Sequence, residues 1–236
     1  MRIMAFGDIH EYVHSLPRLA KPLRQADLIL ITGDLTRWRG PETAVKVLDA
    51  IRAYNPRILA QVGNTDDWRT HHYLSQQGLN LHAQGYRFGD LGIFGAGGSN
   101  PTPFCTPTEF SEDEIAAHLM AGYNMVVDAP LKLLVAHCPP YHTEVDRIYS
   151  GYHVGSTSVR KFIEMYQPHI CIAGHIHESA GEDYIGETHV LNPGMLAQGG
   201  YISVTYESDK VSACRVPGHD PRHYSTSPFL PSSMLG

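Results

Sequence analysis

The chain has 236 residues, of which 42% are apolar and 18% charged, with a formal net charge of -6, four cysteines and fifteen histidines. This length fits one large domain better than two, and a domain of this size can bury a sizeable hydrophobic core without disulfide bonds or structural metal ions. The net negative charge argues against nonspecific electrostatic binding to the phosphate backbone of nucleic acids. No apolar run approaches the roughly 18 residues of a membrane span, so we expect no membrane insertion.

The N-terminus and the cysteines together favour a cytoplasmic protein. Asp8 interrupts the N-terminal apolar stretch too early for the core of a signal peptide. The cysteines are widely spaced and form no Cys-x-x-Cys pair, which argues against a zinc ribbon or a disulfide scaffold and fits a reducing compartment. We expect all four to be small buried apolar side chains: Cys105, Cys138, Cys171 and Cys214.

The first third of the chain alternates short apolar strands with helices. The predicted strands, residues 2–6, 28–32 and 58–62, carry the continuous apolar runs typical of parallel strands that are covered on both faces. Between them lie a helical stretch at residues 14–24 and a helix that opens at Pro41. This alternation predicts an α/β fold.

The rest of the chain is richer in turns. A strand at residues 79–82 precedes a predicted hairpin, 86–88 and 91–94, and the helices that follow begin at Ser111 and Ser156. Further strands are predicted at residues 131–135, 169–173, 188–191, 201–205 and 211–215, the last three antiparallel. We divide the chain into a single domain, residues 1–216, and an irregular tail, residues 217–236.

Five polar clusters follow predicted strands directly. Because ligand sites in open α/β sheets lie beyond the carboxyl ends of the strands, we expect these loops to converge in one crevice. The clusters are Gly7-Asp8-Ile9-His10, Gly33-Asp34, Gly63-Asn64-Thr65-Asp66, His137 and Gly174-His175-Ile176-His177.

The side chains in these clusters predict a transition-metal site. Carboxylate, carboxamide and imidazole groups together favour Mn, Fe, Co or Zn over an all-oxygen Mg or Ca site. Asp8 and His10 leave a strand two residues apart, so they can point the same way and share one ion. Seven potential ligands exceed what one ion with an open catalytic position would use, which favours two ions that share one carboxylate.

The order of these motifs resembles that of the calcineurin-like metallophosphoesterase superfamily. The resemblance spans Asp8 to His177, and the Leu191-Asn192-Pro193-Gly194 run that follows is typical of small, single-domain prokaryotic members. Residues 97–104 and 153–156 further resemble the predicted phosphoesterases of the Icc-like group found in archaea. The resemblance implies a four-layer α-β-β-α sandwich of two mixed sheets, with a dinuclear site at the strand ends.

The resemblance also implies how two ions share the ligands. One ion would bind Asp8, His10, Asp34 and His177, and the other would bind Asp34, Asn64, His137 and His175, with Asp34 bridging. We expect two divalent transition-metal ions, manganese first, with iron, zinc, cobalt or nickel as alternatives. Two such ions, two carboxylates and a bridging hydroxide would leave about one positive charge for a phosphate ester. We also expect catalytic roles for Asp34, Asn64 and His175.

The implied activity is metal-dependent hydrolysis of phosphoesters, as a phosphodiesterase or a phosphatase, by a metal-bridging hydroxide that attacks phosphorus in line. The expected partner is a small phosphoester; nucleic acid enters only as a substrate, and homo-oligomerisation is left open. Many family members carry a histidine after the asparagine, where it stabilises the transition state or protonates the leaving group, but Thr65 stands here. Threonine does not titrate near neutrality, so we hypothesise that aryl or activated esters, including phosphodiesters, are preferred.

Two other functions stay open from the sequence. One is a non-catalytic metal-binding scaffold that makes protein contacts, and the other is a nucleotide-binding module built on residues 95–98, which lack the lysine of a P-loop. Five further residues lie in loops or short helices near the motifs and either line the site or face solvent: Arg37, His71, His72, His142 and His153.

Overall fold

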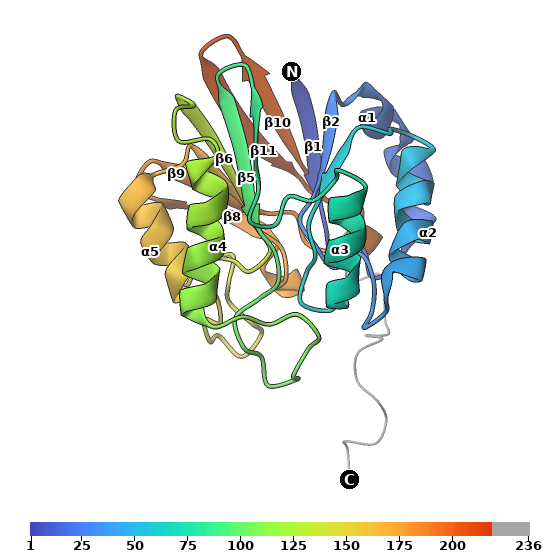
Figure 1. Cartoon of the computed structure of the whole chain (residues 1–236), viewed down its shortest axis with the longest axis horizontal. Helices are drawn as coiled ribbons and strands as arrows, with labels where there is room; N and C mark the ends of the chain where they lie inside the picture. The colour runs from blue at the N-terminus through green and yellow to red at the C-terminus, as the bar shows by residue number, and fades with distance from the viewer. Residues whose placement is uncertain (219–236) are drawn as a thin grey trace.

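The structure, a computed structural model, describes residues 1–218. Two mixed β-sheets face each other, and helices cover the outer face of each sheet (Figure 1). In spatial order the first sheet contains β11 (Lys210–Val216), β10 (Tyr201–Glu207), β1 (Arg2–Phe6), β2 (Leu28–Ile31) and β3 (Ile58–Ala60). The second contains β4 (Gly85–Phe88), β5 (Leu91–Ala96), β6 (Leu131–Ala136), β7 (Ile170–Ile172), β9 (Thr188–Asn192) and β8 (Gly181–Ile185).

Two groups of helices form the outer layers. The first sheet is covered by the 3₁₀ helix η1 (Val13–Leu19), α1 (Ala20–Gln25), α2 (Pro41–Arg52) and α3 (Trp68–Gln76). The second sheet is covered by α4 (Glu112–Asn124) and α5 (Thr157–Tyr166). Two further 3₁₀ turns are η2 (His177–Ser179) and η3 (Leu196–Gln198). The molecule is therefore the four-layer α-β-β-α sandwich that the resemblance implied.

Three apolar clusters hold the four layers together. Side chains alternate between the two faces of a strand, so Met4 of β1 packs under the first helical layer while Ile3 faces the second sheet. The central cluster between the sheets also contains Leu30 and Leu133, and the third cluster joins the second sheet to its helices around Phe162. Both faces of strands such as β2, β5, β6 and β7 are thus buried almost throughout, which explains the continuous apolar runs in the sequence.

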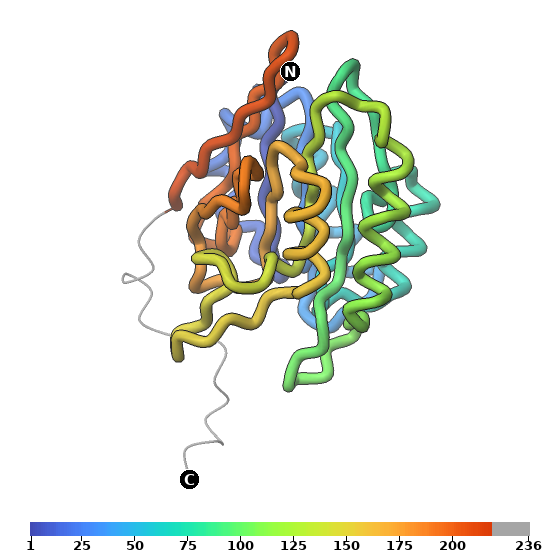
Figure 2. Tube along the Cα trace, turned by 90° about the vertical axis from the view of Figure 1, so that its left-hand side faces the viewer, coloured from blue at the N-terminus to red at the C-terminus, as the bar shows by residue number. Residues whose placement is uncertain are grey.

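The parallel strands determine where the loops meet. Strands β1, β2 and β3 are mutually parallel, and so are β5, β6, β7 and β9. The loops that follow β5 (green) and β6 (yellow) extend from the same lower end of the molecule in Figure 2. The polar clusters that follow the strands therefore gather at this end.

Several local predictions are confirmed by the helix ends. Pro41 begins α2, and Ser111 and Glu114 form a capping box in which each side chain accepts from the other's backbone N–H. Ser156 caps α5 by accepting from Val159 N.

Across residues 1–218, no helix combines the length and apolar character that crossing a membrane requires.

The strand predicted at residues 79–82 is wrong. This segment crosses from one sheet to the other, with a single bridge between Asn80 and Ala60 of β3 and another between His82 and Gly95 of β5. The Asn80 side chain also forms hydrogen bonds with both backbone groups of His82: it donates to the C=O and accepts from the N–H. A ladder needs successive pairs with one neighbouring strand, and this path offers one pair to each sheet.

Three other expectations need correction or lie beyond the described residues. Strand β9 is antiparallel to β8 but parallel to β7, so the antiparallel prediction for residues 188–191 holds on one side only. Cys138 and Cys171 are buried, but Cys105 and Cys214 are exposed, because they lie on a loop and on the edge strand β11. Most of the predicted tail, residues 219–236, lies outside the described residues.

Candidate metal centre

The structure brings the seven predicted ligand residues to the carboxyl edges of the two sheets. The first sheet contributes Asp8 and His10 after β1, Asp34 after β2 and Asn64 after β3. The second contributes His137 after β6, and His175 and His177 after β7. The centre therefore lies where the two sheets meet.

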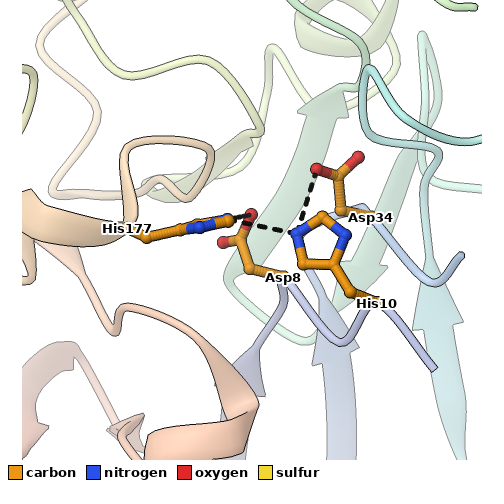
Figure 3. A group of neighbouring side chains, drawn as sticks. All are labelled: Asp8, His10, Asp34 and His177. Atoms are coloured by element: carbon orange, nitrogen blue, oxygen red, sulfur yellow. Dashed lines mark hydrogen bonds and ion pairs between the residues drawn. The ribbon is translucent and has the colours of Figure 1, made fainter. Parts of the chain in front are cut away.

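Four of these side chains form a compact group, with one ligand atom from each lying within 4.8 Å of all the others: Asp8, His10, Asp34 and His177 (Figure 3). His177 Nε2 lies 3.1 Å from Asp8 Oδ1 and 3.1 Å from His10 Nε2. His10 Nε2 lies 3.6 Å from Asp34 Oδ2. These atoms converge on one point.

The remaining three side chains form a second group beside the first. Asn64 Oδ1 lies 3.1 Å from His137 Nε2 and 2.8 Å from His175 Nδ1. His137 Nε2 lies 3.5 Å from Asp34 Oδ2, the oxygen that also faces His10. Asp34 therefore belongs to both groups.

The chemistry of the donor set fits divalent transition metals. Carboxylate oxygens, an amide oxygen and imidazole nitrogens crowd together, and each can direct a lone pair to the same space. Asp8 is fully buried and Asp34 is 2% exposed. Buried carboxylates in such a position need cationic partners, which divalent ions supply.

The backbone around the centre adopts conformations that side chains rarely take. Asp8, Asp34 and His175 have φ angles of 49°, 53° and 68°, in the left-handed region. At Gly63 a Cβ would lie 2.1 Å from Asp34 Oδ1, so only glycine lets this loop approach the carboxylate. Strain of this kind is concentrated at functional sites because the surrounding structure must hold it.

A second buried carboxylate, Asp66, joins the loops that carry Asp34 and Asn64. It accepts hydrogen bonds from the backbone N–H groups of Leu35, Thr36 and Gly63 and from the Thr36 hydroxyl. Burial and the charge of Asp34 raise the pKa of Asp66 to about 7. Asp66 therefore organises the backbone behind the ligands rather than facing the centre.

Burial and the charges within the centre shift the pKa values of its own side chains. Burial alone would lower the pKa of His137, but the charge and hydrogen bond of Asp34, together with the charges of Asp8 and Asp66, outweigh it and raise the pKa to about 9. Burial would raise the pKa of Asp34, yet His137 and His10 hold it well below its usual range. Burial lowers the pKa of His175 to about 4, so this imidazole is neutral at pH 7 and has a lone pair for a metal.

The Thr65 hydroxyl is committed to the backbone. It donates to the carbonyl oxygen of Thr36 at 2.7 Å, while Thr65 N donates to Asp34 Oδ1 at 2.9 Å. Thr65 therefore helps to hold Asp34, and its hydroxyl proton is not directed at a leaving group.

The additional residues that the sequence singled out lie in other surroundings. The Arg37 guanidinium stacks over Tyr12, 4.4 Å from the ring centroid. His71 stacks on Trp68, with centroids 4.2 Å apart, and His72 meets the same indole edge-on. His153 Nδ1 lies 2.6 Å from Asp146 Oδ1, and its ring packs on His142. None of these contacts is with a predicted ligand.

The sequence did not predict the roles of three residues next to the centre: Thr106, Glu109 and Asn192. Asn64 Nδ2 donates to Thr106 Oγ1, which in turn donates to Glu109. Asn192, in the Leu-Asn-Pro-Gly run, donates to the Ile176 carbonyl and so holds the loop between the last two histidines. The polar residues at positions 106–109 mark this loop as a candidate for contact with the site. The sequence does not reveal, however, that the loop reaches the end of β3, where Asn64 lies.

A pocket of about 410 Å³ is lined in part by residues 178–182, which follow His177 in the chain, but it has the wrong charge for a phosphate. Its lining includes Glu144, Glu178 and Glu182, with Arg147 as the cationic residue. Three carboxylates disfavour an anionic ester there. A phosphate would be attracted to a cation-loaded centre instead.

Comparison with known proteins identifies the family. The family model for calcineurin-like phosphoesterases matches residues 1–179. The chain belongs to this family. An uncharacterized protein of the archaeon Methanocaldococcus jannaschii is 35% identical over 198 residues, which cover 82% of this chain and 88% of the relative. Its Asp and His cluster is a candidate site for divalent metal ions, as membership of this family leads one to expect.

Solved structures share the fold at low sequence identity. A Thermus thermophilus protein superimposes with a TM-score of 0.69 at 18% identity, covering 90% of this chain and 97% of its own. A structure described as a dimetal phosphatase from Danio rerio superimposes with a TM-score of 0.61 at 11% identity, covering 91% and 95%. At these identities the similarity establishes the two-sheet calcineurin-like fold of the phosphoesterase family and leaves the substrate to the site itself.

Proposed function

We propose that the protein is a dinuclear metal-dependent phosphoester hydrolase. The observation that carries the proposal is the position of Asp34 Oδ2, 3.6 Å from His10 Nε2 and 3.5 Å from His137 Nε2. A carboxylate oxygen between two ligand groups can bridge two ions, and dinuclear hydrolases space their ions about 3.5 to 4 Å apart. Family membership supports the hydrolase class, and the dimetal phosphatase with the same fold supports two ions.

Each side chain has a defined role in this proposal. Asp8, His10 and His177 hold one ion, Asn64, His137 and His175 hold the other, and Asp34 bridges. Two bound divalent cations supply Lewis acidity, a lowered pKa for water and positive charge for the phosphate. Asn64 and His175 are neutral ligands of the second ion. Because they do not cancel its positive charge, the loaded site stays cationic. Manganese is the metal we expect first.

The surroundings of Thr65 support a preference for good leaving groups. Its hydroxyl proton is donated to the Thr36 carbonyl, so it does not protonate a departing alkoxide. A p-nitrophenolate leaves without protonation, whereas a simple alkoxide does not. We therefore propose aryl or otherwise activated phosphoesters, including phosphodiesters, as the substrates that react fastest.

The test is a metal and substrate panel with a matched pair of variants. Metal analysis after loading with Mn is combined with hydrolysis of bis-p-nitrophenyl phosphate, p-nitrophenyl phosphate and an alkyl monoester. Asp34→Asn is expected to lower the bound metal and to reduce turnover by at least about 100-fold, because the bridging charge is lost. Asp90→Asn, which changes an exposed carboxylate in the β4–β5 turn, is expected to retain both.

The outcomes separate the proposal from its alternative. Two bound ions without turnover of any ester would support a metal-binding scaffold in place of an enzyme. Turnover by Asp34→Asn at the wild-type rate would remove the bridging role. Equal rates for the alkyl monoester and p-nitrophenyl phosphate would contradict the proposed leaving-group preference alone.

A further inference from the structure

The loop between β5 and α4 holds the Asn64 side chain and backbone. We call residues 102–109 the strap. Asn64 Nδ2 donates to Thr106 Oγ1 at 3.0 Å, and Thr108 N donates to the Asn64 carbonyl at 3.0 Å. Thr108 Oγ1 also donates to the Asp66 carbonyl at 2.6 Å. Three hydrogen bonds therefore join the strap to the segment that carries the predicted amide ligand.

The carboxylate of Glu109 fixes the direction of hydrogen bonding within the strap. Its Oε1 accepts from the hydroxyls of Thr102 and Thr106, at 2.6 and 2.5 Å, and from Thr106 N at 2.8 Å. Burial acts to raise the pKa of Glu109, but these hydrogen bonds from Thr102 and Thr106 outweigh it and lower the pKa. Glu109 is therefore ionised at neutral pH and can only accept hydrogen bonds.

This polarity determines which end of the Asn64 amide faces the metal centre. The Thr106 hydroxyl has one proton, and that proton is donated to Glu109. Its oxygen must then accept from Asn64, so the amide nitrogen faces the strap. Asn64 Oδ1 is left facing His137 Nε2 and His175 Nδ1, at 3.1 and 2.8 Å. The reversed amide would direct two N–H donors at the predicted metal position.

We propose that Thr106 and Glu109 are positioning residues that orient Asn64 Oδ1 as a metal ligand. The inference rests on the proposed function, because it takes Asn64 as a ligand of the second ion. Hydrogen bonds to the groups behind metal ligands orient those ligands and tune their affinity. The strap, which lies well beyond Asn64 in the sequence, thereby becomes part of the metal site.

Manganese binding by three single variants tests the proposal. Thr106→Val keeps the shape of the side chain but removes the hydroxyl, so we expect the affinity for the second ion to fall by about 10-fold or more. Thr106→Ser restores the hydroxyl and should restore the affinity. Thr102→Val is the matched control, because it removes an equivalent hydrogen bond to the same Glu109 oxygen without touching the bond between Thr106 and Asn64. Stoichiometry and affinity are measured by calorimetric titration and metal analysis, without an activity assay.

The results distinguish this inference from the proposed function. Wild-type affinity in Thr106→Val, or an equal loss in Thr102→Val, would overturn the positioning role and leave the strap as a simple loop anchor. A parallel Asn64→Ala variant is expected to lose the second ion. If it binds both ions as tightly as the wild type does, or if the wild type binds fewer than two, the proposed ligand set fails together with the inference.

Discussion

Asp66 shows how one side chain without a ligand role can organise two ligand loops. Its buried carboxylate accepts from three backbone N–H groups and one hydroxyl, on the loops after β2 and β3. Asp67, the next residue, caps α3 at the surface by accepting from Arg69 N. Adjacent aspartates thus have very different surroundings, which allows a matched test of stability.

We expect Asp66→Ala to lower the free energy of unfolding by about 3 kcal/mol or more, because several buried donors lose their acceptor. Asp67→Ala should cost about 1 kcal/mol, the usual value for a helix N-cap. Urea unfolding of the metal-free protein measures both. Equal losses in the two variants would show that the Asp66 network contributes no more than an ordinary cap.

The ligand types and their grouping at strand ends could be predicted from the sequence, because parallel strands deliver their carboxyl ends to one edge. The role of Thr106 could not be predicted in the same way. Thr106 lies on a loop whose path depends on the packing of both sheets, which local sequence does not encode.

At the scale of elements, the segment between α3 and β4 joins the two helical layers through imidazoles. His82 is buried between His71 of α3 and His118 of α4, with centroid distances of 5.3 and 4.3 Å. Its Nδ1 accepts from Gly97 N at 2.9 Å. Alternation of apolar and polar residues predicted a strand here, but the segment crosses between sheets, a path that periodicity cannot distinguish from a strand.

This arrangement predicts a loss of stability in acid. Burial, together with His118 and His71, lowers the pKa of His82 to about 3, whereas histidine in an unfolded chain titrates near 6.5. Between about pH 6.5 and 3, the unfolded state binds a proton that the folded state excludes, so stability falls as the pH falls. One such group contributes a slope of up to about 1.4 kcal/mol per pH unit.

His82→Gln should therefore flatten the dependence of unfolding free energy on pH between about 4 and 6, even though the variant loses packing at every pH. His14→Gln changes an exposed histidine in η1 and is the control. Urea unfolding at a series of pH values gives the slopes. An unchanged slope in His82→Gln would assign the acid sensitivity to other groups.

At the scale of the whole molecule, the candidate centre joins the two halves of the sandwich. Four of its side chains come from the first sheet and three from the second, while the apolar cluster between the sheets makes the rest of the contact. A chain with a net charge of -6 can still present a cationic centre once two divalent ions are bound. The two sheets were implied by a resemblance of motifs; the alternation of predicted strands and helices indicated only an α/β fold.

A centre built from both sheets should stabilise the entire fold when it is loaded. Ions that bind the folded chain alone add about 2.7 kcal/mol each to the unfolding free energy at a metal concentration 100 times the dissociation constant. We therefore expect unfolding in Mn to require more heat or urea than unfolding in a chelator. His175→Ala should lose much of this shift, whereas His189→Ala, which removes an imidazole paired with Glu182 outside the centre, should retain it. Identical unfolding curves in Mn and in chelator would show that bound metal does not stabilise the fold, and an equal shift in His175→Ala would remove His175 from the ligand set.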